Sequence, residues 1–169
     1  MVDDDNFQLM MLTQILTSCG FKSDTANGGL DGLAKYKARV ANFVEGMKKL
    51  EYISVGQGAG KYMSDDQLFE NLMRNVVAPA RFIISDYEMP DMKGTRMCQA
   101  IREHFAALTA KLVNNQTSDP AFADIQSCVP AEQMSTLLSK FKPITVIVSA
   151  FTSDAVLQQD VKDCQIDYV

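Results

Sequence analysis

The stretch "IISDYEMPDMKG", residues 83–94, joins a short apolar run to a carboxylate and a sharp turn. The apolar run stops at Asp86, and a Met-Pro pair and a glycine follow it. A short apolar run bounded by turn residues is typical of a buried strand. An aspartate that is merely exposed on the surface does not need a buried strand to carry it. We therefore expect the strand to present Asp86 at its tip, bound to a metal ion and open to an incoming group.

The composition is that of an ordinary globular domain. The chain has 169 residues, of which 47% are apolar and 22% charged, and this length predicts one domain. A net charge of −5 argues against nucleic acid or an anionic membrane surface as a partner. The four cysteines form no CxxC pair, and the single histidine, His104, leaves little room for imidazole chemistry. No signal-type N-terminus or membrane-length apolar run stands out, which predicts a cytoplasmic location.

Strand-like and helix-like patterns alternate along the chain. The strand-like segments are a stub before Asp3, residues 21–26, 81–85, 144–150 and 166–169, and helical periodicity separates them. This alternation predicts an α/β fold with a doubly wound, five-stranded parallel sheet. The surplus length predicts two helical or loop insertions, at about 48–80 and 113–140. Within the first, "VGQGAGKY" at 55–62 lacks the spacing of a phosphate-binding loop, and we interpret it as a flexible tip.

Acidic and hydroxyl residues follow the expected strands. Asp3 and Asp4 follow the first, Asp86 ends the third, and Ser149 follows the fourth. In a doubly wound sheet the carboxyl ends of the strands meet at one edge, so these side chains should converge. Such a cluster repels itself and raises at least one carboxyl pKa, and a divalent cation relieves the repulsion. An oxygen-only ligand set suits Mg²⁺.

Together, "VDDDNF" at residues 2–7, "IISDYEMPDMKG", "IVSA" at 147–150 and "DYV" at 167–169 resemble the receiver domain of two-component response regulators. The opening "VDDDNFQLMML" is similar to receivers attached to hybrid histidine kinases. The resemblance covers nearly the whole chain except the two insertions, and it implies a flavodoxin-like fold. Its most specific part is the run Asp-x-x-Met-Pro-x-Met-x-Gly.

The resemblance implies a role for each matching residue. Asp86 would be the phosphoacceptor, attacking a phosphohistidine of a histidine kinase or a histidine phosphotransfer protein. Asp4, Asp86 and the backbone carbonyl of Glu88 would hold Mg²⁺, and Asp3 would act through a coordinated water. Ser149 would bond the transferred phosphoryl group, and Tyr168 would follow it inward as an aromatic switch. The domain would signal in a phosphorelay and catalyse only its own phosphorylation and dephosphorylation.

Two features depart from the family pattern. The family closes its fifth strand with a Lys-Pro pair whose ammonium contacts the phosphoryl group, but this sequence stops at Val169. Lys142-Pro143 precedes the fourth strand, at the wrong end of the sheet. Only Met1-Val2 remain of a first strand that should be longer. We therefore expect a receiver truncated at both ends, and the alternative is a degenerate receiver that transfers phosphate poorly.

Other interpretations stay open. Residues 3–5 alone could be a solvated acidic run that caps a helix, Ser149 could be an ordinary loop serine, and Tyr168 could be core packing. At the level of function, the fold could serve as a phosphorylation-independent pseudo-receiver that binds other proteins. An aspartate-nucleophile phosphatase is a weaker alternative: Glu88 occupies the position of its second acid, but the Met-Pro turn that follows favours a receiver.

Overall fold

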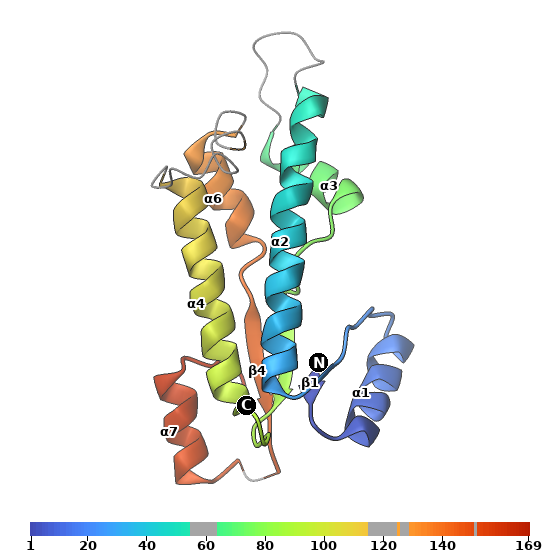
Figure 1. Ribbon diagram of the computed structural model, residues 1–169, viewed down its shortest axis with the longest axis vertical. Coiled ribbons are helices and arrows are strands. Elements are labelled where there is room, and N and C mark those ends of the chain that lie inside the picture. Colours follow the sequence, from blue (N-terminus) through green and yellow to red (C-terminus); the bar gives the residue numbers. More distant parts are fainter. Residues whose placement is uncertain (55–63, 115–124, 126–128, 151) are drawn as a thin grey trace. The chain divides into compact units, whose positions relative to one another are not determined.

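The computed structural model describes residues 1–54, 64–114, 125, 129–150 and 152–169. These residues form four strands and six helices, whose order along the chain is shown in Figure 1. They divide into two compact units. The first contains Met1–Lys37, Arg81–Glu103 and Pro143–Val169, and the second contains Ala38–Ala80 and His104–Lys142. The predicted flexible tip at 55–62 lies outside the described residues, and the single domain with two insertions stays a prediction.

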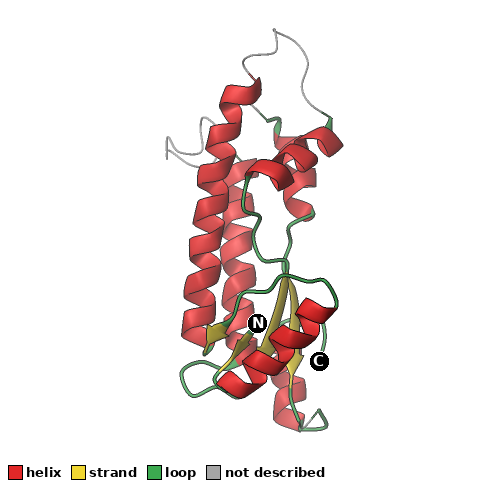
Figure 2. Cartoon of the chain, turned by 90° about the vertical axis from the view of Figure 1, so that its right-hand side faces the viewer, coloured by secondary structure: helices red, strands yellow, loops and turns green. Residues whose placement is uncertain are grey.

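The first unit is built on a parallel sheet. Its strands, yellow in Figure 2, are β1 (Val2–Asp3), β2 (Ala26–Asn27), β3 (Phe82–Asp86) and β4 (Ile144–Val148). Their order in the sheet is β2-β1-β3-β4. Parallel neighbours need crossover connections, and helices supply them here, which confirms the α/β class. The register places Val2 opposite Ser85 and Asp86 opposite Val148. The strands β1 and β3 are therefore adjacent at their carboxyl ends.

The predicted fifth strand is wrong for the described residues: the sheet has four strands. At the end of the chain only Tyr168 pairs with β4, in an isolated parallel bridge to Val146. The reason lies one residue earlier, because the Asp167 carboxylate accepts hydrogen bonds from the backbone N–H and the hydroxyl of Thr145, at 2.8 and 2.7 Å. A side chain thus takes the backbone donor that a longer ladder would have used.

Helices α1 (Asn6–Ser18) and α7 (Ala155–Asp163) belong to the first unit, together with the first turns of α2 (Gly29–Ser54) and α4 (Gly94–Val113). Helix α2 packs closely on the sheet at Gly32, where a Cβ would lie 2.7 Å from the Met97 sulfur and 2.9 Å from Val2. The described core of this unit is apolar, apart from a few buried polar residues, and includes Val2, Leu9, Ala26, Ile83, Met97, Cys98, Ile101, Ile147, Leu157 and Cys164.

The second unit contains α3 (Asp65–Asn75), α6 (Ala131–Ser139) and the later turns of α2 and α4. Helix α3 begins with a capping box, in which Ser64 and Gln67 each accept the other's backbone N–H. Three rings from separate elements pack together: Phe141 lies 5.1 Å from Phe43 and 5.5 Å from Phe69 between ring centroids. This aromatic cluster anchors the core of the unit.

Candidate functional site

The turn after β1 holds two carboxylates in different surroundings. Asp3, the last residue of β1, is only 4% exposed, whereas the next residue, Asp4, is exposed. The Asp3 carboxylate accepts a hydrogen bond from the backbone N–H of Asp5 at 2.8 Å. Asp5 in turn caps α1 by accepting the N–H of Phe7 at 2.8 Å. Side chains therefore hold the passage from strand to helix, and the hydrogen bond from Asp5 fixes the direction of the Asp3 carboxylate.

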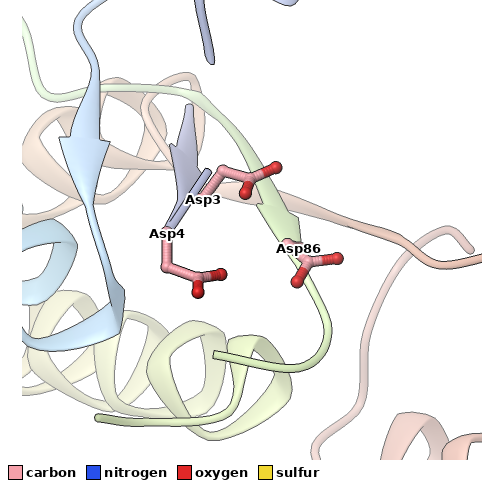
Figure 3. A group of neighbouring side chains, drawn as sticks. All are labelled: Asp3, Asp4 and Asp86. Carbon is pink, nitrogen blue, oxygen red and sulfur yellow. The ribbon is translucent and has the colours of Figure 1, made fainter. Parts of the chain in front are cut away.

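Strand β3 brings a third carboxylate to the same place. Because Val2 pairs with Ser85, the next residues along the two parallel strands, Asp3 and Asp86, are neighbours at the sheet edge. One carboxylate oxygen from each of Asp3, Asp4 and Asp86 lies within 4.8 Å of the others (Figure 3). The sequence predicted this convergence from the strand ends alone.

The loop that leaves Asp86 folds back against it. The backbone N–H of Gly94 donates to the Tyr87 carbonyl at 3.0 Å, and the Ser85 hydroxyl donates to the Asp86 carbonyl at 2.9 Å. A Cβ on Gly94 would lie only 1.9 Å from that carbonyl oxygen. Only glycine fits here, because the start of α4 touches the backbone of Asp86 directly. This explains the glycine at the end of the Met-Pro motif.

Asp91, in the same loop, holds the start of α2. Its carboxylate accepts the backbone N–H groups of Gly29 and Leu30 at 3.0 and 2.9 Å, across more than 60 residues of sequence. Hydrogen bonds from these backbone groups hold the pKa of Asp91 below its ordinary value. Asp91 thus serves as the cap of a distant helix and fastens the loop after Asp86 to it.

Burial and mutual repulsion act on the site carboxyls. Desolvation raises the pKa of Asp86 above its ordinary value, and the charges of Asp3 and Asp4 raise it further, against hydrogen bonds from the Tyr87 and Glu88 backbone. Desolvation also raises the pKa of Asp3, with Asp4 and Asp5 adding to it against the hydrogen bond from Asp5. The three carboxylates of the cluster therefore repel one another, and a bound cation would relieve this repulsion.

The three carboxylates fit a small divalent cation. Two oxygens bound to one Mg²⁺ lie at most about 4.2 Å apart, twice the usual Mg–O distance, so a spread of 4.8 Å needs only a small closing movement. All three ligand atoms are oxygen, the donor type that Mg²⁺ prefers. The exposed Asp4 leaves one side open to water, which Mg²⁺ retains in most protein sites.

The other predicted site residues are Glu88, Ser149 and Tyr168. Glu88 is exposed, two residues beyond Asp86. Ser149 is half-buried and directly follows Val148, whose carbonyl accepts the Tyr87 backbone N–H at 3.1 Å. Tyr168 is 64% exposed, so its ring lies outside the core. The roles predicted for these three residues stay predictions.

Sequence reasoning missed a polar network beside the site. The Lys93 ammonium donates to the Tyr87 hydroxyl at 2.9 Å and to the Asp160 carboxylate at 3.2 Å. The Tyr87 hydroxyl also donates to Asp160, at 2.7 Å. We call this set of Tyr87, Lys93 and Asp160 the loop–α7 network. Lys93 and Asp160 lie 67 positions apart, and no local sequence pattern links them.

Comparisons with protein families, with curated proteins and with solved structures found no match to this chain. Within the residues that the structure describes, no helix is both long and apolar enough to cross a membrane.

Proposed function

We propose that this protein is a receiver domain of a two-component phosphorelay, with Asp86 as the phosphoacceptor. One observation carries the proposal: carboxylates from the ends of the adjacent strands β1 and β3 meet within 4.8 Å, and Asp86 stands on the tip of β3. The strand order β2-β1-β3-β4, with Tyr168 bridging to the outer side of β4, supports a flavodoxin-like, receiver-type fold.

In the proposed reaction a carboxylate oxygen of Asp86 attacks the phosphorus of a phosphohistidine. The new O–P bond forms as the P–N bond breaks, and the electron pair of that bond goes to the ring nitrogen. A donor ring that is protonated on its other nitrogen then leaves as neutral imidazole. Desolvation is the main cause of the raised pKa of Asp86, and a carboxylate that is partly stripped of water is a more reactive nucleophile.

The residues that would hold Mg²⁺ are Asp4, Asp86 and the backbone carbonyl of Glu88, with Asp3 acting through a coordinated water. When bound, the cation would neutralise charge on the transferring phosphoryl oxygens. Asp3 supports this arrangement from a buried position, because its hydrogen bond from Asp5 fixes the direction of its carboxylate. Ser149 would donate its hydroxyl to the phosphoryl group, and Tyr168 would report the change by moving inward.

The partner in this proposal is a histidine kinase or a histidine phosphotransfer protein on the cytoplasmic side of a membrane or in the cytoplasm. The chain modifies itself and turns over no free substrate, so it is a signalling domain rather than an enzyme. Hydrolysis of its own acyl phosphate would reset it.

A small phosphodonor tests the proposal without knowledge of the kinase. The full chain is incubated with phosphoramidate and Mg²⁺, and the label is mapped by mass spectrometry. We expect alkali-labile label at Asp86, and none in Asp86→Asn. Asp65→Asn is the matched control, because it changes an exposed aspartate on α3, in the other unit and outside the cluster. Equal labelling of Asp86→Asn and wild type would end the proposal. Steady phosphate release from an aryl phosphate would favour a phosphatase instead.

A further inference from the structure

The loop–α7 network places an ammonium group between the acceptor loop and a helix. Lys93 Nζ lies 2.9 Å from the Tyr87 hydroxyl, 3.2 Å from Asp160 and 4.7 Å from the centre of the Tyr87 ring. The Tyr87 hydroxyl closes the triangle by donating to Asp160 at 2.7 Å. Tyr87 directly follows Asp86, and Asp160 lies on α7, so the network ties the acceptor loop to that helix.

Lys93 lies one residue from the contact between α4 and the backbone of Asp86. Its neighbour Gly94 bonds the Tyr87 carbonyl and touches the Asp86 carbonyl, which leaves no room for a Cβ between them. The Lys93 backbone is therefore one residue from the point where the chain touches the Asp86 carbonyl oxygen. A lysine side chain has a flexible four-carbon stem, so its ammonium can reach different hydrogen-bond acceptors around the same backbone position.

The Lys93 ammonium is partly exposed and has more than one acidic neighbour. The Lys93 side chain is 37% exposed, and its Nζ lies 3.7 Å from a Glu88 carboxylate oxygen as well. It therefore stands among three acidic or hydroxyl groups without being enclosed by them. A partly exposed ion pair of this kind contributes little to stability. The ammonium would therefore leave it to bind a nearby group that carries more negative charge.

Resting on the proposed phosphoacceptor role of Asp86, we propose that Lys93 is the cation that contacts the phosphoryl group and that it leaves Asp160 to do so. A phosphoryl group on Asp86 brings more negative charge than the carboxylate and three strong acceptor oxygens. Of the two hydrogen bonds that the described residues give to the Asp160 carboxylate, the one from Tyr87 then remains. Helix α7 thereby loses one hydrogen bond to the loop after Asp86. Phosphorylation of Asp86 thus changes how firmly α7 is held.

Hydrogen exchange of α7 tests this exchange of partners. The full chain is treated with phosphoramidate and Mg²⁺, labelling is measured by mass spectrometry, and amide exchange is followed in peptides that cover Ala155–Asp163. In labelled wild type we expect exchange in α7 to rise about two- to fivefold, the factor for losing one partly exposed ion pair. In Lys93→Met, amide exchange of α7 without the donor should already match that of labelled wild type, and it should not change when Asp86 is labelled.

Three further variants separate the network from general damage. Asp160→Asn removes the other partner and should also give fast exchange without the donor. Lys93→Arg keeps the cation and should restore the response to labelling. Lys162→Met is the matched control, because it removes an exposed lysine from α7 itself and should behave as wild type.

Labelled wild type with unchanged exchange in α7 would overturn the inference while leaving the proposed function intact. A full response to labelling in Lys93→Met would do the same. Absence of label in wild type would overturn the proposed function and this inference together, so the two failures are distinguishable.

Discussion

Substituting Gly94 by alanine places one methyl group into the tightest backbone contact of the site. The new Cβ would lie 1.9 Å from the Asp86 carbonyl oxygen, where ordinary contacts begin at 3.4 Å, so the two backbones must separate by about 1.5 Å. The opposing atom belongs to the main chain, and no side-chain rotation can relieve the clash. The start of α4 must therefore move away from β3.

That movement strains the 3.0 Å hydrogen bond from the Gly94 N–H to the Tyr87 carbonyl, and the new Cβ would also lie 2.7 Å from the Ser85 hydroxyl oxygen. Overpacking alone costs about 1–3 kcal/mol. A lost hydrogen bond adds about 1 kcal/mol. We expect Gly94→Ala to lower the free energy of unfolding by about 2–4 kcal/mol in urea denaturation, and to slow labelling of Asp86 in the protein that stays folded.

Gly20→Ala is the matched control. Gly20 has a φ of +83°, and a Cβ there would meet nothing within 4 Å. Its substitution should cost only the strain of the left-handed conformation, about 1–2 kcal/mol, and leave labelling unchanged. If Gly94→Ala is as stable as wild type, the close approach that we describe between α4 and Asp86 is wrong.

Four more predictions concern the carboxylates and the cation that they would hold. Asp91→Ala removes the cap of α2 and should cost about 1 kcal/mol in thermal or urea unfolding, and an unchanged midpoint would contradict the capping role. Because the pKa of Asp91 is lowered in the folded chain, its contribution is complete above its ordinary pKa of 3.8 and is lost as the pH falls through the folded value. The stability difference between wild type and Asp91→Ala should therefore shrink on acidification, and a difference that grows would refute this sign. Mg²⁺ at about a hundred times its dissociation constant should stabilise wild type by about 2.7 kcal/mol, and chelation should reverse this. Asp3→Asn relieves the buried charge, so it should be more stable than wild type without Mg²⁺ and gain less when Mg²⁺ is added; equal gains in both proteins would exclude Asp3 from the site.

The parallel sheet and the acidic cluster could be predicted from the sequence because both follow from local patterns. The β-branched run 144–148 and the apolar run before Asp86 became β4 and β3. Adjacent strand ends then brought Asp3, Asp4 and Asp86 together. The fifth strand failed because a side chain, Asp167, took the backbone donor of Thr145, and strand propensity carries no information about such competition.

Contacts between distant segments could not be predicted. Asp91 caps a helix that begins more than 60 residues earlier, and Lys93 pairs with Asp160 across 67 positions. Periodicity was also of limited use for α1, which contains no charged residue to mark its outer face. Ile15 falls at helical spacing with Leu9 and Leu12 but is 53% exposed, and only Leu9 of that helix is buried.

Diffraction from crystals grown with Mn²⁺ in place of Mg²⁺ tests the central claim most directly, because manganese gives an anomalous signal and accepts the same oxygen ligands. We predict an anomalous peak bound by the carboxylates of Asp4 and Asp86, with Asp3 beside it. No peak at these carboxylates at saturating Mn²⁺, or density bound only elsewhere on the chain, would contradict the account.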